Sequence, residues 1–201
     1  MKKIVLPIVA AFMMAAQTNT DAPLAAQTNT DAPHFTPDGQ LLLPKDYREW
    51  IYLSSGLGMT YGPAAQADQG NPKFDNVFVN PAAYRAFLES GRWPDKTMLI
   101  LEIRRAAGKG SINNGGHYQS DALQVEAAVK DEARFPSKWA YFGFGRNGTA
   151  APHPPTSACN SCHNQNAAVE NTFVQFYPTL LEIATRKGTL NPAYVQRAAS
   201  Q

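Results

Sequence analysis

The sequence predicts an α+β protein, in which an antiparallel β-sheet carries flanking helices. Two observations support this class. Short segments rich in β-branched and aromatic residues follow one another through the middle of the chain, separated by glycine-rich turns. Helices are expected before and after these segments, so the order is helix, strand, helix, several antiparallel strands and then helices.

The N-terminal region has the layout of a secretory signal peptide. Lys2 and Lys3 precede an apolar run that ends in small residues and is too short to span a membrane. We expect residues 1–16 to be removed, although cleavage after Ala22 or as late as Ala26 also fits the pattern. The expected product is a periplasmic protein without a membrane span.

A duplicated segment, AAQTNTDAP, occurs at Ala15–Pro23 and again at Ala25–Pro33. Its polar composition has no apolar periodicity, so we expect residues 17–35 to be a disordered leader and residues 36–201 to be one folded domain. Removal of residues 1–16 takes away two lysines, and the 18 basic and 16 acidic side chains become 16 and 16. This balance argues against a nucleic-acid partner, whose surface needs an excess of positive charge.

The domain is expected to open with a helix. Pro44 and Asp46 are suitable helix-start residues, and the segment Tyr47–Leu53 has helical spacing. A glycine- and proline-rich loop is expected at Gly56–Pro72. The β-branched and aromatic segment Val77–Val79 then predicts a strand.

A second helix follows that strand. Asn80 is a suitable N-cap and Pro81 a suitable first helical residue for PAAYRAFLES, which Gly91 ends. Thr97–Ile103 then predicts a strong strand, in which Leu99, Leu101 and Ile103 share one face and Met98, Ile100 and Glu102 share the other.

The remaining elements follow from alternation and from proline positions. A hairpin-like loop is expected at Gly108–Gly116, followed by a strand at Leu123–Val129, where apolar residues alternate although the composition suits a helix. Trp139–Gly145 predicts an aromatic strand, whose large side chains are expected mostly in the core. Ala167–Lys187 has a helical pattern broken at Pro178, and Asn191-Pro192 starts a last short helix.

The segment Cys159–His163, CNSCH, holds the only two cysteines of the chain. A structural zinc site needs four ligands, and no other pair has zinc-finger spacing. A thioredoxin-like dithiol belongs near the start of a βαβ unit, whereas this motif follows a proline-rich loop late in the chain; a plain structural disulfide stays a minor alternative. In an exported chain, Cys-X-X-Cys-His is the attachment signature of one covalent haem c, with Cys159 and Cys162 as thioether anchors and His163 as the iron ligand.

The late position of the motif bears on the sixth iron ligand. No methionine follows His163, and the methionines outside the signal peptide are Met59 and Met98. Met98 is expected in the core, on the strand face opposite Leu99. His117 and His153 remain candidates, although both are expected at the surface. One protein ligand would leave an open site, which suits binding of a small gas or substrate chemistry better than fast electron transfer.

The chain resembles the cytochrome P-460 and cytochrome c'-beta family over about residues 36–187. The segments that carry the resemblance are DGQLLLPKDYREW, VNPAAYRAFLESGRWPDKT, EAAVKDEARF, KWAYF and CNSCHNQNA with FVQFYPTL. The resemblance implies an antiparallel sheet with flanking helices, a homodimer and a periplasmic five-coordinate haem c. Four-helix cytochromes c' share the late motif, but the predicted strands argue against that bundle.

One position divides the family that the chain resembles. Its hydroxylamine-oxidising enzymes carry a lysine that cross-links to the haem, in the strand after the PDGT turn. Alignment on PDKT places Leu101 there, and leucine has no nucleophilic nitrogen. Lys96 lies five positions earlier with the opposite strand parity, and Lys109 lies in a glycine-rich loop. The resemblance also implies a proton-relay role for Glu126, which is otherwise an exposed strand glutamate.

We therefore expect nitric oxide or a related small ligand to bind against an apolar distal wall that includes Leu101. Three alternatives stay open: hydroxylamine oxidation, in which Glu126 would move protons, peroxidase activity, and simple electron transfer. A periplasmic redox partner is also compatible with a haem protein.

Overall fold

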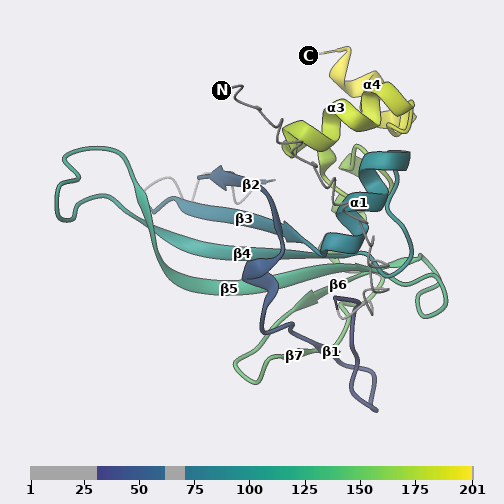
Figure 1. Cartoon of the computed structure of the whole chain (residues 1–201), viewed down its shortest axis with the longest axis horizontal. Helices are drawn as coiled ribbons and strands as arrows, with labels where there is room; N and C mark the ends of the chain where they lie inside the picture. The colour runs from purple at the N-terminus through teal and green to yellow at the C-terminus, as the bar shows by residue number, and fades with distance from the viewer. Residues whose placement is uncertain (1–30, 62–70, 201) are drawn as a thin grey trace, which may run out of the picture.

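The computed structural model describes residues 31–61 and 71–200 (Figure 1). A five-stranded antiparallel sheet runs in the order β2-β3-β4-β5-β6, and a separate pair joins β1 to β7. The strands of the described residues are β1 (Leu41–Leu42), β2 (Ile51–Leu57), β3 (Lys73–Val79), β4 (Met98–Ala107), β5 (Tyr118–Lys130), β6 (Trp139–Gly143) and β7 (Thr149–Ala150). Its helices are α1 (Pro81–Ser90), α2 (Ala158–Asn166), α3 (Pro178–Lys187) and α4 (Pro192–Ala198). The predicted α+β class is confirmed.

Each face of the large sheet is covered by different elements. On the face that carries Leu99, which we call the helix side, side chains of α1 and α3 pack against the strands. On the face that carries Met98, which we call the Tyr47 side, residues of β1, β7 and the 3-10 turn Tyr47–Glu49 complete a second core cluster. Figure 1 shows α1 and α3 on one side of the strands and the β1–β7 pair on the other.

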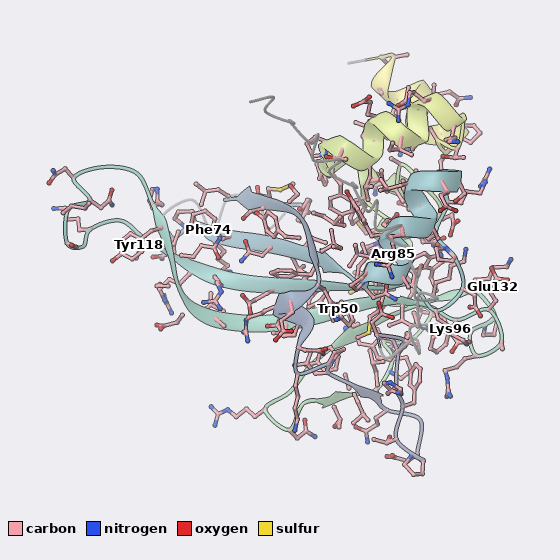
Figure 2. All side chains as sticks on the ribbon, in the orientation of Figure 1. Trp50, Phe74, Arg85, Lys96, Tyr118 and Glu132 are labelled. Atoms are coloured by element: carbon pink, nitrogen blue, oxygen red, sulfur yellow. The ribbon has the colours of Figure 1, made fainter. Side chains whose placement is uncertain are left out.

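The central strands confirm the predicted alternation. Leu99 pairs with Ala128 and Leu101 pairs with Glu126, so these four side chains share the helix side. The β4–β5 hairpin extends well beyond the helices, and Figure 2 shows Phe74 and Tyr118 at that end of the sheet, with Lys96 and Glu132 at the opposite end. The choice of a strand over a helix at Leu123–Val129 is therefore confirmed.

The expected helix at Tyr47–Leu53 is wrong. Only a 3-10 turn forms at Tyr47–Glu49, and β2 begins at Ile51. Ile51 and Leu53 pack against the helix-side cluster, whereas Tyr52 between them is 53% exposed. This alternation, together with pairing to β3, satisfies the backbone of the segment as an edge strand and overrides its helical spacing.

The expected helix before Pro178 is also wrong. Helix α3 begins at Pro178, which takes the first helical position, where its missing amide hydrogen costs nothing. The preceding segment forms a turn at Val169–Thr172 and a 3-10 helix at Val174–Phe176. The cysteine motif itself lies in a helix, α2, and the last helix α4 is present as predicted.

Helix α1 has the predicted bounds, and Gly91 ends it in the left-handed conformation at φ 70°. The Asn80 side chain does not cap it, because its Oδ1 accepts from the backbone N–H of Met98 at 2.8 Å. A carboxylate from the leader acts at the helix start instead: Asp31 accepts from the Ala82 N–H at 3.1 Å. Residues 31–35 thus contact the domain, and Phe35 packs against the Tyr47-side cluster.

The predicted signal peptide and most of the duplicated leader lie outside the described residues, as does Gly62–Gly70 of the predicted loop. Within residues 31–61 and 71–200, no helix is long and apolar enough to cross a membrane.

Candidate functional site

Helix α2 presents the two cysteines of the motif. Ser157 caps the helix, and its hydroxyl accepts from Asn160 N at 3.4 Å and from Asn160 Nδ2 at 3.0 Å. Cys159 and Cys162 are three residues apart, so they lie on one face of this helix, and both are free and partly exposed. Burial and the nearby Glu126 carboxylate raise the pKa of the Cys159 thiol. Two thiols one helical turn apart can each form a thioether with one vinyl group of a haem.

The imidazole of His163 is held on three sides. Its Nδ1 lies 2.7 Å from the carbonyl oxygen of Asn171, and its ring stacks between Tyr141 and Phe173 at centroid distances of 4.1 and 4.3 Å. Burial lowers the pKa of His163 and so favours the neutral ring. A neutral ring that donates from Nδ1 keeps the lone pair on Nε2, which is the arrangement that a metal-ligating histidine needs.

The helix-side face of the sheet is deeply buried at one end, and its described residues are less buried further along β4. Leu99 is buried beneath the helices, whereas Leu101 is only partly buried and belongs to neither core cluster formed by the described residues. Its cross-strand neighbours are Val77 on β3 and Glu126 on β5. This partly exposed apolar patch lies beside the cysteine motif, because Cys159 is within electrostatic range of Glu126.

Glu126 lies on the helix side, next to Leu101, and is partly buried. Gln124 donates from Nε2 to its carboxylate at 2.7 Å. Glu126 pairs with Gly143, and a Cβ on that glycine would meet the His153 ring at 3.6 Å and Gln124 at 3.9 Å. His153 therefore lies over Gly143, close enough to interact electrostatically with Glu126. Burial raises the pKa of Glu126, and His153 and Gln124 only partly offset this effect.

Asp75 is a member of this face that the sequence did not reveal. It pairs with Ile103 across β3 and β4, two positions along from the Leu101 pair. Burial, with a further contribution from the Glu126 charge, raises its pKa to about 6. The strand predicted from the sequence, Val77–Val79, begins after Asp75, so no sequence signal placed Asp75 on the sheet. Asp75 and Glu126 thus add protonatable groups to an otherwise apolar surface.

The other candidate ligands lie elsewhere. Met98 is fully buried on the Tyr47 side, as expected of a core residue. His117 is exposed in the β4–β5 loop region, while His153 is partly buried beside Glu126. Of the lysines, Lys96 pairs with Asp131 at 2.6 Å, at the end of the sheet marked in Figure 2, and Lys109 is exposed in the hairpin loop.

Of the predicted aromatic core, Trp139, Tyr141 and Phe142 are buried, and Tyr141 alone among them stacks on His163. No group of three or more His, Cys, Asp and Glu side chains is placed to hold a bare metal ion within the part of the chain that the structure describes. A haem needs less from the protein, because the porphyrin itself supplies four ligands. The two thiols, the oriented imidazole and the partly buried Leu101 on the neighbouring sheet face fit such a group.

A comparison with protein families decides what kind of protein carries these residues. The model of the Cytochrome P460 family matches residues 44–174, which is more than half of the chain and includes the cysteine motif. The chain belongs to the cytochrome P460 family. Membership implies a haem c protein that binds a small ligand, in agreement with the motif and the site. None of the curated proteins searched matches the chain significantly.

Proposed function

We propose that this cytochrome P460 family member is a periplasmic mono-haem c protein that binds nitric oxide or a related small ligand. The observation that carries this proposal is Leu101. It occupies the position where the resemblance puts a cross-linking lysine, and it is a partly buried apolar residue on the helix-side face. Without a nucleophilic nitrogen there, the haem stays an ordinary thioether haem c.

Cys159 and Cys162 would hold the group covalently, and His163 would ligate its iron. When bound, the haem would supply an iron that can bind a small ligand. The protein contributes a fixed, neutral His163 and an apolar wall at Leu101 and Val77. The Leu101 and Val77 side chains have no hydrogen-bond donor to offer a ligand, which favours nitric oxide and carbon monoxide, since these depend less on polar stabilisation.

The test of ligand class compares nitric oxide binding with hydroxylamine oxidation in the purified holoprotein. We expect a five-coordinate high-spin ferrous spectrum, a Soret band where unmodified haem c absorbs, tight nitric oxide binding and negligible hydroxylamine turnover. A strongly red-shifted Soret band, or rapid hydroxylamine turnover, would contradict the proposal. Leu101→Lys is the constructive variant, because it restores the nucleophile and should red-shift the Soret band after peroxide treatment. Leu101→Met is its matched control and should not.

Covalent attachment is tested separately. The haem should stay with the denatured wild-type chain, and the mass should equal the mature chain plus one haem. Cys159→Ala combined with Cys162→Ala should lose it. Extraction of the wild-type haem by acidified solvent would contradict the assignment of the two thioethers.

Hydroxylamine oxidation or peroxidase chemistry is the second candidate, and one observation favours it. The raised pKa of Glu126, with Gln124 and His153 beside it, suits a group that accepts and releases protons during turnover. If this chemistry operates, Glu126→Gln should abolish turnover, whereas nitric oxide binding should stay unchanged. If nitric oxide binding is the role, neither the Glu126→Gln variant nor the wild type should turn over hydroxylamine or peroxide.

Electron transfer, a periplasmic redox partner and a homodimer remain proposals of lower rank. A low-spin ferrous spectrum without added ligand would assign the protein to electron transfer. Sedimentation of the purified protein checks the dimer, and cell fractionation checks the periplasmic location.

A further inference from the structure

The turn that follows α2 has an unusual backbone. Val169 and Thr172 close it with a hydrogen bond from Thr172 N to Val169 O at 2.9 Å. Glu170, within the turn, has φ 49°, a left-handed conformation that glycine adopts without strain and that glutamate adopts at a cost. Glycine would suit this backbone better, so the contacts of the Glu170 side chain are what can offset the cost.

The side chain of Glu170 forms a buried ion pair. Lys130, at the end of β5 and only 7% exposed, places its Nζ 2.9 Å from the Glu170 carboxylate and donates to the Trp93 carbonyl at 2.7 Å. The indole N–H of Trp139 also donates to the carboxylate, at 3.3 Å. Asn191 donates to the Glu170 backbone carbonyl at 2.8 Å. The turn is therefore fixed to β5, β6 and the start of α4.

The next residue in the turn is the one that orients His163. The carbonyl oxygen of Asn171 accepts the Nδ1–H of His163 at 2.7 Å and the hydroxyl hydrogen of Tyr141 at 3.2 Å. Tyr141 also stacks on the imidazole, with ring centroids 4.1 Å apart. His163 and Tyr141 thus donate to the same carbonyl oxygen, and each hydrogen bond weakens the other.

We propose that Lys130, Glu170 and Tyr141 are positioning residues that set the hydrogen bond between Asn171 and His163, and so tune the iron ligand from outside its coordination shell. The Lys130–Glu170 pair fixes the direction of the Asn171 carbonyl. The Tyr141 hydroxyl reduces the electron density that the carbonyl offers to the imidazole. This inference rests on the proposed role of His163 as iron ligand.

The Lys130–Glu170 ion pair and the Tyr141 hydroxyl have opposite effects on the Asn171–His163 hydrogen bond, so variants can separate them. A stronger hydrogen bond at Nδ1 makes the imidazole a better electron donor, raises the iron–histidine stretching frequency and lowers the reduction potential. Loss of the ion pair frees the carbonyl and weakens that hydrogen bond. Loss of the Tyr141 hydroxyl leaves the carbonyl to His163 alone and strengthens it.

The experiment is resonance Raman spectroscopy of the ferrous holoprotein, paired with a reduction potential for each variant. Tyr141→Phe keeps the ring and removes only the hydroxyl, so the iron–histidine band should move up and the potential down. Glu170→Gln and Glu170→Gly should both move the band down. Glu170→Gly matters because it suits the left-handed backbone: a wild-type band in this variant would overturn a role for the side chain.

The matched control is Glu182→Gln, which removes an exposed ion pair to Arg186 on α3 at 2.6 Å and should leave the band in place. If the Glu170 variants fail to fold, Tyr141→Phe still decides, since an unmoved band and potential would overturn the proposal. If His163 were not the iron ligand, the result would be different: the wild-type spectrum would show no iron–histidine band that the His163→Ala variant loses.

Discussion

Two glutamates on adjacent strands show how differently the two faces of this sheet treat a carboxylate. Glu102 on β4 faces the Tyr47 side, is 2% exposed, and accepts from the Tyr47 hydroxyl and from the side chains of Arg48 and Arg104. Burial alone would raise its pKa, but these donors outweigh burial and lower the pKa. On the helix side the balance is reversed, because burial raises the pKa of Glu126 against the weaker effects of His153 and Gln124.

The difference separates a carboxylate that is ionised and fully hydrogen-bonded from one whose charged form is disfavoured by burial. Glu102 is ionised, saturated with donors and sealed under the 3-10 turn Tyr47–Glu49, so it has no capacity left for a ligand. Glu126 and Asp75 lie on the less buried part of the helix side, where the described residues give neither as many donors as Glu102 has. Burial raises the pKa of both carboxyl groups, which is the kind of perturbation that carboxylates in ligand pockets show.

Of the substitutions that test this comparison, Glu102→Ala should have the largest effect on stability. Glu102→Ala leaves two arginines and the Tyr47 hydroxyl without their acceptor, which should cost about 3 kcal/mol of unfolding free energy. Urea unfolding measures the loss. The haem spectrum is the internal control and should not change, because Glu102 lies on the face away from His163. A decrease in unfolding free energy below about 1 kcal/mol would mean that water replaces Glu102 as the hydrogen-bond partner of the arginines.

Asp75→Asn should have an intermediate effect that depends on pH. The folded-state pKa of about 6 lies above the usual 3.8, so the folded state holds the proton more tightly than the unfolded chain. Wild-type stability should therefore fall as pH rises from about 4 to about 6, and the penalty persists above that range. The variant should be more stable than wild type at pH 8, by about 1 kcal/mol after allowance for partial exposure, and not at pH 4. Thermal melts at the two pH values measure this, and equal stabilities at pH 8 would contradict it.

The smallest effect is expected at Glu126. Glu126→Gln removes a carboxylate whose charged form is disfavoured by burial, so stability at pH 7 should stay the same or rise by up to about 0.5 kcal/mol. The sign is opposite to that of Glu102→Ala, although both changes remove a sheet glutamate. Parallel urea titrations decide the point, and a clear loss of stability at Glu126 would show that it too is structural.

Local patterns predicted the part of the molecule that local chemistry controls. The alternation in Thr97–Ile103 placed Met98 and Leu101 on opposite faces, and Asn80-Pro81 with Gly91 placed α1. The segment Tyr47–Leu53 could not be assigned in this way, because its spacing suits a helix and an edge strand equally. Pairing with β3, which is distant in sequence, made it a strand.

The parts of the site that were missed depend on contacts between distant segments. Asp75 acquires its raised pKa from burial and from Glu126 on a strand two positions across the sheet. Glu170 is fixed by Lys130, forty residues earlier in the chain, and its left-handed backbone is one that the sequence rules reserve for glycine. The cysteine motif needed no such contact, because its spacing alone carries the chemistry.

The contact of Asp31 with the start of α1 has a consequence for how the gene can change. Asp31 follows each of the expected processing sites at residues 16, 22 and 26, so every mature form keeps it. The two copies of AAQTNTDAP are identical, and replication slippage that deletes residues 15–24 would leave the second copy, with Asp31, at an unchanged distance from Ala82. A chain with one copy of the repeat is therefore expected to keep the contact of Asp31 with the start of α1 and to fold like the chain with two.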